Sequence, residues 1–263
     1  MSSESVKTED MRTASRIVSA GCKYNMEDNM KVTYLVHSGF FVETQQAYYL
    51  FDYIRGQVPE PEGGKPLYVF ASHSHGDHFS EKIFRPEEVP TADRYILSYD
   101  IIKKYRKGKV QWATDYQDKI CRAQPGQAIT LPRCRVTSLK STDIGAAYLI
   151  EEDDCRIYHA GDLNWWYWEG EALAWNHNME INYKREIDRL KGMEIDVAFV
   201  PLDPRLEGGY WYGMDYFLQN VSVKHVFPMH FWKDYSVIDR YLQEHGGQGH
   251  IHKIEREGQN YEI

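Results

Sequence analysis

The most informative stretch of the chain is Ser72-His73-Ser74-His75-Gly76-Asp77-His78, which places three imidazoles and one carboxylate within six residues. Such crowding disfavours protonated histidine, because like charges that lie close together oppose the charged form. A divalent cation resolves the conflict, since neutral imidazole and carboxylate are ordinary zinc ligands. The alternative is a histidine-rich surface turn, but two motifs further along the chain offer the additional ligands that a metal centre needs.

Both downstream motifs come at the end of an expected strand. The first is Tyr158-His159-Ala160-Gly161-Asp162, whose small Ala-Gly pair permits a tight turn and a close approach of the backbone to a metal. The carboxylate of Asp162 is suited to bridge two cations. The second is Pro228-Met229-His230, which supplies another imidazole. Either motif alone is a weak signal, since an Asp after Gly usually marks a turn. Together with residues 72–78 they indicate a metal centre.

Short strands and a few helices are expected around these motifs. Residues 67–71 form an apolar run, typical of a buried strand, that ends at the histidines. Further strands are expected at 31–36, 40–43, 48–53, 94–97, 110–113, 119–122, 128–131, 133–139, 146–151, 155–159, 195–200 and 223–228. Helices are expected at 100–107, 179–190, 214–220 and 234–246. Two strand-rich halves, each followed by helices, predict an α+β fold of two packed mixed sheets with helices outside.

The chain is interpreted as one domain over residues 30–263, because no repeat and no low-complexity linker follows residue 65. Residues 1–29 are polar and lack periodicity, so we expect them to form an N-terminal extension. A chain of 263 residues buries a large core and needs no disulfide. Its four cysteines form no C-x-x-C pair, which favours reduced thiols.

Composition narrows the expected partners. The formal net charge is −8, so the chain repels phosphate backbones and no nucleic acid is expected to bind. The main cationic cluster, at 103–109, is more simply the solvated end of a helix. The sequence shows neither an export signal nor an apolar run as long as a membrane span. We therefore expect a cytoplasmic protein with a small-molecule substrate and no membrane partner; the oligomeric state is not indicated.

With these motifs in place, the chain resembles the metallo-β-lactamase superfamily over roughly residues 30–262. The resemblance is carried by His-x-His-x-Asp-His at 73–78, His-Ala-Gly-Asp at 159–162 and the late His230. Within the superfamily it is similar to the small cytoplasmic branch of ascorbate-phosphate lactonase-like proteins and metal-dependent hydrolases. The resemblance implies an αβ/βα sandwich with two metals at one edge. The implied ligands are His73 and His75 for the first metal, Asp77, His78 and His230 for the second, and Asp162 as the bridge.

One ligand departs from the family pattern. The family usually supplies another histidine to the first metal from a loop before a Gly-x-x-Tyr-Leu-Ile strand, and residues 141–150 of this chain contain none. Asp143 lies on this loop, and we predict that it replaces the histidine, although it could instead cap a turn before Gly145. A carboxylate oxygen is a harder donor than the imidazole nitrogen that it would replace, so the first site would favour harder metal ions. The expected cofactors are therefore two divalent ions, zinc first, with Mn²⁺ or Fe²⁺ also compatible.

Two metals close together hold a hydroxide and polarise a carbonyl or phosphoryl oxygen. The expected reaction is therefore hydrolysis of a small-molecule ester, lactone or phosphate ester. Asp77 is expected to act as a ligand and as a proton shuttle to the leaving group. One alternative is an RNase Z-like phosphodiesterase, which needs an extended basic surface that the sequence lacks. The other is a non-catalytic metal-binding protein whose first site is degenerate.

The residues that contact substrate are less strongly indicated. Trp165 and Trp166 follow Asp162 closely, so we expect at least one of them to line the pocket, although indoles equally often belong to the core. Arg205 is a candidate fork for a carboxylate or phosphate, but an ion pair with Asp203 or Glu207 is at least as favoured. His37 is interpreted as structural.

Overall fold

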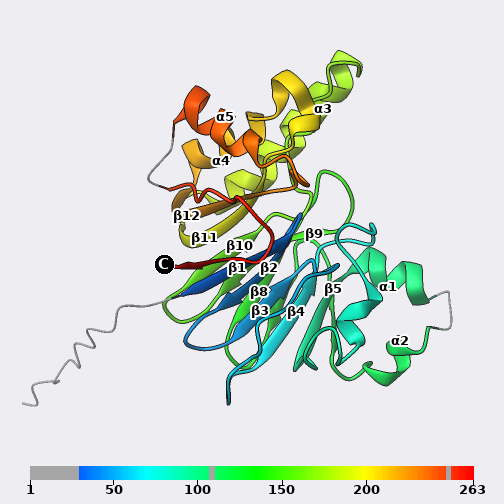
Figure 1. Cartoon of the computed structure of the whole chain (residues 1–263). Helices are drawn as coiled ribbons and strands as arrows, with labels where there is room; N and C mark the ends of the chain where they lie inside the picture. The colour runs from blue at the N-terminus through cyan, green and yellow to red at the C-terminus, as the bar shows by residue number, and fades with distance from the viewer. Residues whose placement is uncertain (1–29, 107–109, 247–249) are drawn as a thin grey trace, which may run out of the picture.

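The computed structural model describes residues 30–106, 110–246 and 250–263, so the expected extension over 1–29 lies outside it. Across these ranges the strands form two mixed sheets (Figure 1). The first sheet contains, in spatial order, β13 (Gln259–Glu262), β1 (Lys31–Val36), β2 (Gly39–Glu43), β3 (Tyr48–Phe51), β4 (Leu67–Ala71), β5 (Arg94–Ser98) and β6 (Ile120–Ala123). The second contains β12 (Ser222–Met229), β11 (Glu194–Pro201), β10 (Arg156–His159), β9 (Ala146–Glu151), β8 (Arg135–Lys140) and β7 (Ala128–Thr130).

Each sheet has a parallel part and an antiparallel part. In the first sheet β3, β4, β5 and β6 run parallel, and in the second β10, β11 and β12 run parallel. The remaining neighbours are antiparallel. The three histidine-containing motifs all lie at the carboxyl ends of parallel strands, namely β4, β10 and β12. The chain thus delivers its polar motifs at the carboxyl ends of strands, where α/β sheets usually bind ligands.

Strand β4 shows why the sequences of these central strands are continuously apolar. Successive side chains of a strand point to opposite faces of the sheet. Tyr68 and Phe70 lie in the core between the two sheets, whereas Leu67, Val69 and Ala71 lie in a second core on the other face. Both faces are covered, so alternation of polar and apolar residues is lost.

The helices cover the outer faces of the sheets (Figure 1). Beside the first sheet lie α1 (Tyr99–Arg106) and α2 (Trp112–Asp115), with the 3₁₀ helix η1 (Glu81–Phe84). Beyond the second sheet lie α3 (Leu173–Ile187), α4 (Tyr212–Asn220) and α5 (Ser236–His245), with the 3₁₀ helices η2 (Asp188–Leu190) and η3 (Pro204–Gly209). The predicted α+β sandwich of two mixed sheets with helices outside is confirmed.

Two elements differ from the sequence-based expectation. The strand predicted at 110–113 is wrong, because Trp112 begins the short helix α2. Its indole stacks on Phe84 with ring centroids 4.5 Å apart, so packing outweighs the β propensity of a four-residue stretch. Strand β13 is not among the expected strands, and it pairs antiparallel with β1 at the edge of the first sheet.

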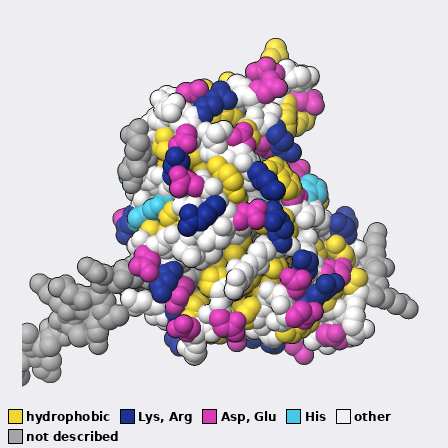
Figure 2. Space-filling model, viewed as in Figure 1, with side chains coloured by type: hydrophobic (Ala, Val, Ile, Leu, Met, Phe, Trp, Pro, Cys, Tyr) yellow, Lys and Arg dark blue, Asp and Glu magenta, His cyan; other side chains and the backbone are white. Residues whose placement is uncertain are grey.

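The outer surface is mixed in charge on the face that Figure 2 shows, where Lys and Arg side chains are interspersed with Asp and Glu. Part of the predicted cationic cluster, residues 107–109, lies outside the described ranges. Within those ranges, no helix combines the length and the apolar character that crossing a membrane requires.

Candidate metal centre

Loops from both sheets bring the candidate ligands together. His73, His75, Asp77 and His78 follow β4, and Asp162 follows β10. Three further loops take part: His230 directly follows β12, Asp143 lies between β8 and β9, and His37 occupies the turn between β1 and β2. All seven residues predicted as ligands therefore converge at one edge of the sandwich. His37, which the sequence led us to interpret as structural, joins them.

Two glycines allow these loops to close on the histidine stretch. Gly145 has a φ of +83°, and a Cβ atom there would lie 2.0 Å from the carbonyl oxygen of Ser72. Gly161 has a φ of +51°, and its Cβ would lie 2.6 Å from Ser72 Cβ. Larger residues would be excluded both by the backbone conformation and by contact with Ser72. The tight turn expected at Gly161 is confirmed.

The first cluster consists of His73, His75, Asp143 and Asp162, with one ligand atom of each within 4.8 Å of the others. His73 Nε2 lies 3.5 Å from Asp162 Oδ2, and His75 Nδ1 lies 3.5 Å from Asp143 Oδ2. Two ligands of one tetrahedral ion, each about 2.0–2.2 Å from it, lie about 3.3–3.6 Å apart. The spacing therefore suits a shared ion. His75 and Asp143 are exposed, so this cluster opens to solvent.

The second cluster consists of His37, Asp77, His78 and His230, whose ligand atoms also lie within 4.8 Å of one another. The three histidines are buried, and the Asp77 side chain is 27% exposed. This cluster therefore lies deeper than the first.

Asp162 faces both clusters. Its Oδ2 is directed toward His73, whereas its Oδ1 lies 3.1 Å from His78 Nε2 and 3.3 Å from His230 Nε2. The carboxylate is itself buried. One side chain thus offers a separate oxygen atom to each cluster, which is the arrangement expected of a bridging carboxylate.

Asp52 holds the loop after β4, residues 72–78, in place. His78 Nδ1 donates to Asp52 Oδ2 at 2.7 Å, and the Ser72 hydroxyl donates to the same oxygen at 2.6 Å. His73 Nδ1 lies 2.9 Å from Ser72 Oγ. Burial alone would raise the pKa of Asp52, but the hydrogen bond from His78 and the neighbouring histidines hold it below its usual range. The carboxylate fixes which nitrogen of His78 faces the centre.

Asp203 fixes the orientation of His230 in the same way. His230 Nδ1 lies 3.0 Å from Asp203 Oδ2, and Arg205 Nε donates to both carboxylate oxygens, at 2.9 and 3.0 Å. Arg205 therefore forms the ion pair with Asp203 that the sequence allowed as an alternative. Its side chain is 53% exposed. The sequence patterns indicated neither Asp52 nor the contact of Asp203 with His230, although an acid beside an apolar strand signals a buried charge that needs a partner.

Unsatisfied polar atoms gather at this edge of the described structure. Six buried atoms here make no well-oriented hydrogen bond, although Asp162 Oδ1 lies 3.1 and 3.3 Å from two of them; they are His37 Nδ1 and Nε2, His73 Nε2, His78 Nε2, Asp162 Oδ1 and His230 Nε2. Native proteins leave few such atoms, and a bound ion is one explanation. Burial lowers the pKa of His37 and of His73 to about 4, whereas the Asp162 carboxylate, against the effect of burial, raises the pKa of His78 and raises that of His230 to about 8, so an ion would displace protons from these two imidazoles. Neutral imidazole is the form that binds a metal, and the residues fit one.

The tryptophans separate into different environments. Trp166 Nε1 donates to the Asp162 carbonyl at 3.0 Å, and its ring lies 5.3 Å from that of His230, so it lines the centre. Trp165 instead lies against α3 and α4, where its ring contacts Lys184 and Tyr212. Trp232 is not singled out by the sequence. It is 44% exposed, and its ring lies 4.1 Å from that of His37.

His159 belongs to the frame of the site. Its Nε2 lies 2.9 Å from the Ser38 carbonyl oxygen, and its Nδ1 accepts from the Gly161 N–H at 3.1 Å. Both nitrogens therefore engage the backbone, and this histidine joins neither cluster.

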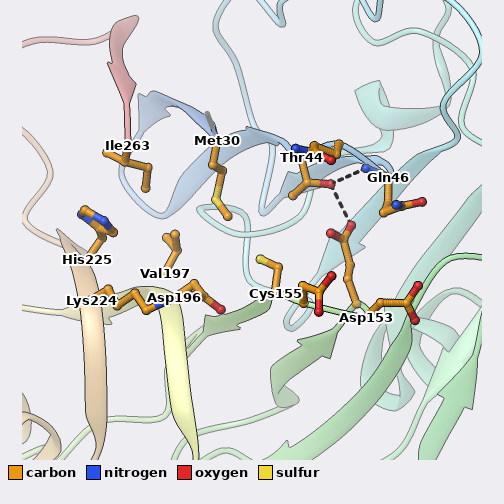
Figure 3. Close-up of a pocket in the computed structure, with 13 residues that line it drawn as sticks. Met30, Thr44, Gln46, Asp153, Cys155, Asp196, Val197, Lys224, His225 and Ile263 are labelled. Atoms are coloured by element: carbon orange, nitrogen blue, oxygen red, sulfur yellow. Dashed lines mark hydrogen bonds and ion pairs between the residues drawn. The ribbon is translucent and has the colours of Figure 1, made fainter. Parts of the chain in front are cut away.

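A separate cavity of about 240 Å³ lies at the opposite ends of the strands (Figure 3). It is lined by residues that include Met30, Cys155, Asp196 and His225. Thr44 donates to Glu152 at 2.7 Å in its wall, which ties the loop after β2 to the end of β9. None of the candidate ligands lines this cavity, so the two places are distinct.

The solved structures with a similar fold include several metal-dependent proteins. The metallo hydrolase Igni18 of Ignicoccus hospitalis is 17% identical with a TM-score of 0.58, and the match covers 89% of this chain and 98% of that one. A putative metal-dependent hydrolase of Parabacteroides distasonis is also 17% identical, with a TM-score of 0.55 and coverage of 88% and 94%. CmlA of Streptomyces venezuelae, a diiron β-hydroxylase, is 11% identical with a TM-score of 0.55 over 90% of this chain and 55% of its own.

The family comparison agrees with the fold. No curated protein sequence matches the chain. The family model of the β-lactamase superfamily domain matches residues 31–230, which include every candidate ligand described above. The chain therefore belongs to the β-lactamase superfamily, and it shares its fold with the metal-dependent proteins named above.

Proposed function

We propose that the chain hydrolyses an ester, lactone or phosphate ester of a small molecule at a centre of two divalent ions. The observation that carries this proposal is the position of Asp162, whose two oxygens face two separate ligand clusters. His73, His75 and Asp143 would hold the first ion, and Asp77, His78 and His230 the second. When bound, such an ion pair polarises the scissile carbonyl or phosphoryl group and supplies hydroxide near neutral pH.

The chain's own groups complete the reaction. Asp77 is 27% exposed, so it is the acid of the deeper cluster that can pass a proton between the centre and solvent. Asp52 and Asp203 keep His78 and His230 in one orientation and prevent the rings from turning. Trp166 closes one side of the centre and limits the access of water.

The proposed substrate carries a negative charge. Arg205 is anchored to Asp203 through its Nε, and its guanidinium is about half exposed beside the centre. A guanidinium in this position is suited to bind a carboxylate or phosphate group of the substrate. The exposed indole of Trp232, beside His37, offers an apolar face to the substrate. Lactones and esters of small acids or phosphorylated sugars have this combination of charge and carbon skeleton.

The non-catalytic alternative rests on a degenerate first site. Asp143 lies 3.5 Å from His75 and within the same cluster as His73 and Asp162. The first cluster therefore has four donors, although the histidine that the family usually supplies there is absent. With Asp162 included, a donor set of two imidazoles and two carboxylates is harder than a set of three imidazoles and one carboxylate. We therefore propose Mn²⁺ or Fe²⁺ beside Zn²⁺ as the ions to test.

The experiment is a turnover assay on the full chain, stripped of metal and reloaded separately with Zn²⁺, Mn²⁺ or Fe²⁺. The panel contains lactones, carboxylic esters, phosphomonoesters, phosphodiesters and an RNA oligonucleotide. We expect metal-dependent hydrolysis of one or more small anionic substrates, and none by a His230→Ala variant. Cleavage of the RNA alone would favour the nuclease. Two bound ions without turnover on any substrate would contradict the proposal and favour a metal-binding role.

A further inference from the structure

His37 lies in the turn between β1 and β2, and its side chain is fully buried, with an exposed fraction of 0%. Within the described ranges neither Nδ1 nor Nε2 has a hydrogen-bond partner. The other buried histidines of the centre each hold one nitrogen on a neighbouring polar group, as His78 does on Asp52. A buried imidazole without any partner is rare in native proteins and calls for a physical explanation.

The ring of His37 is directed into the second cluster. Its centroid lies 4.3 Å from that of His230 and 5.3 Å from that of His78. One of its nitrogens, with ligand atoms of Asp77, His78 and His230, belongs to a set whose members all lie within 4.8 Å of one another. An imidazole at this position is therefore able to share an ion with these three residues.

The backbone keeps the ring there at a conformational cost. His37 has a φ of +56°, in the left-handed region that residues other than glycine seldom adopt. Its N–H donates to the hydroxyl of Tyr34 at 2.8 Å, and its carbonyl accepts from the N–H of His230 at 3.3 Å. Trp232 covers one face of the ring. Strained conformations of this kind persist mainly at functional sites.

The alternative role for His37 would be to orient Asp77 by a hydrogen bond. The distance from His37 Nε2 to Asp77 Oδ2 is 3.5 Å, longer than the roughly 2.7–3.2 Å of an N–H···O hydrogen bond. The same distance falls within the spacing of about 3.3–3.6 Å that separates two ligands of one tetrahedral ion. The geometry thus favours co-ligands over a donor and its acceptor.

We infer that His37 is an additional ligand of the second ion. The inference rests on the proposed two-ion centre and makes that centre asymmetric. Apart from the bridging Asp162, the second ion has three buried imidazoles and Asp77, while the first has two imidazoles and Asp143 and opens to solvent. Imidazole-rich sites favour ions such as Zn²⁺ or Co²⁺ over harder ions. The second site therefore fills first when metal is added and empties last under a chelator.

The test is a Co²⁺ titration of the metal-free full chain, followed by visible absorption and by competition with a chelator. The main variant is His37→Gly, because glycine adopts a positive φ without strain and leaves a space that free imidazole can fill. The second variant is His37→Asn, since asparagine also tolerates this conformation and keeps an amide donor for Asp77. His225→Ala is the control, a histidine in the distant cavity of Figure 3. Circular dichroism confirms that each variant is folded.

We expect wild type and His225→Ala to bind two Co²⁺ ions, one more tightly than the other. In both His37 variants the tight step should weaken by more than about 100-fold, since loss even of an outer partner costs about 10–100-fold. The Co²⁺ absorption of that step should change, and added imidazole should restore affinity and spectrum in His37→Gly. The affinity of the weaker Co²⁺ site should not change.

Unchanged affinity and spectrum in both His37 variants would overturn the inference. Weakening in His37→Gly that imidazole does not restore, with wild-type affinity in His37→Asn, would also overturn it and assign His37 to the orientation of Asp77. A wild-type chain that binds fewer than two ions would instead refute the proposed two-ion centre. The two failures are therefore distinguishable.

Discussion

Asp143 and His75 meet at the solvent-exposed side of the first cluster, where Asp143 Oδ2 lies 3.5 Å from His75 Nδ1. Their side chains are 43% and 54% exposed, whereas His73 and Asp162 are buried. Half of the donors of the first cluster therefore come from residues that the core does not need. Their removal should change metal binding without changing the fold.

Asp143→Ala should lose one equivalent of metal. The first cluster would fall from four protein donors to three, one of them shared with the second ion, so it should release its ion on dialysis more readily than the second cluster. The measurement is metal content per chain by mass spectrometry, with Asp153→Ala as the control because Asp153 is an exposed acid beside the distant cavity. Two ions and full activity in Asp143→Ala would instead point to a first site completed by water or substrate.

His78→Ala and His230→Ala should both abolish turnover but differ in stability. Loss of His78 leaves the buried Asp52 with only Ser72 as its partner, whereas Asp203 keeps Arg205 when His230 is lost. Breaking a buried pair costs about 3–5 kcal/mol because a charge remains uncompensated. We therefore expect native circular dichroism for both variants and a lower urea midpoint for His78→Ala.

Adding Asp52→Asn to His78→Ala should recover part of that loss, because the neutral amide needs no counter-charge. Equal midpoints for His78→Ala and His230→Ala would show that Asp52 is not held by His78. An unfolded His78→Ala chain would show that the second site is structural.

The close approach of Gly145 to Ser72 predicts a steric effect that can be separated from a conformational one. Gly145→Ala places a Cβ 2.0 Å from the Ser72 carbonyl oxygen, whereas a Cβ added at Gly126, with a φ of +81°, would meet nothing within 4 Å. Both alanines carry the left-handed penalty of about 1–2 kcal/mol. Only Gly145→Ala should add overpacking of about 1–3 kcal/mol and weaken binding of the first ion through His73. Equal unfolding free energies for the two variants would contradict this.

Arg205 should control the KM for anionic substrates. A charge-assisted hydrogen bond contributes about 1.5–3 kcal/mol, so Arg205→Ala should raise the KM roughly tenfold or more for a charged substrate. A neutral analogue should be bound as before, and metal content should not change. Arg156→Ala is the matched control, since Arg156 is similarly exposed and pairs with Glu151 away from the centre. An equal loss for charged and neutral substrates would assign Arg205 to holding Asp203 alone.

The pair His225 and His252 predicts an acid-sensitive contribution to stability. Their rings lie 2.9 Å apart from Nδ1 to Nε2, and burial, with the nearby His225, lowers the pKa of His252 to about 4. An unfolded histidine has a pKa near 6.5, so the unfolded chain takes up this proton first as the pH falls. The contribution is therefore present above about pH 6.5 and is lost progressively toward pH 4.

Urea unfolding between pH 7 and pH 4 measures this effect. We expect the free energy of unfolding to fall less steeply on acidification in His252→Gln than in wild type. His177→Gln, at an exposed histidine, should follow the wild-type curve. Parallel curves for wild type and His252→Gln would contradict the prediction.

Sequence patterns predicted most of the fold and most of the residues that gather at the candidate centre, because both depend on local order. Apolar runs that end in polar motifs mark central strands, and residues 73–78 carry four donors on one short loop. His37 could not be found in this way. It joins the second cluster only because the turn after β1 lies against the end of β12, as the bond from His230 N–H to the His37 carbonyl shows. Such a contact between distant segments leaves no trace in local spacing.

The pocket residues show a second limit. Trp165 and Trp166 are neighbours in the chain, yet one packs against α3 and α4 while the other lines the centre. Which side each indole takes depends on the turn after Asp162, and composition does not encode this. The strand at 259–262 escapes prediction for a related reason, since a short, half-polar edge strand is defined by its partner β1.

A chain of polar contacts crosses the molecule at the metal edge, from Asp52 after β3 through His78, Asp162 and His230 to Asp203 after β11. Its first member belongs to one sheet and its last to the other. Ions bound beside Asp162 would cross-link the two sheets of the sandwich. Metal supply would then set how long the protein survives proteolysis, apart from whether it turns over substrate.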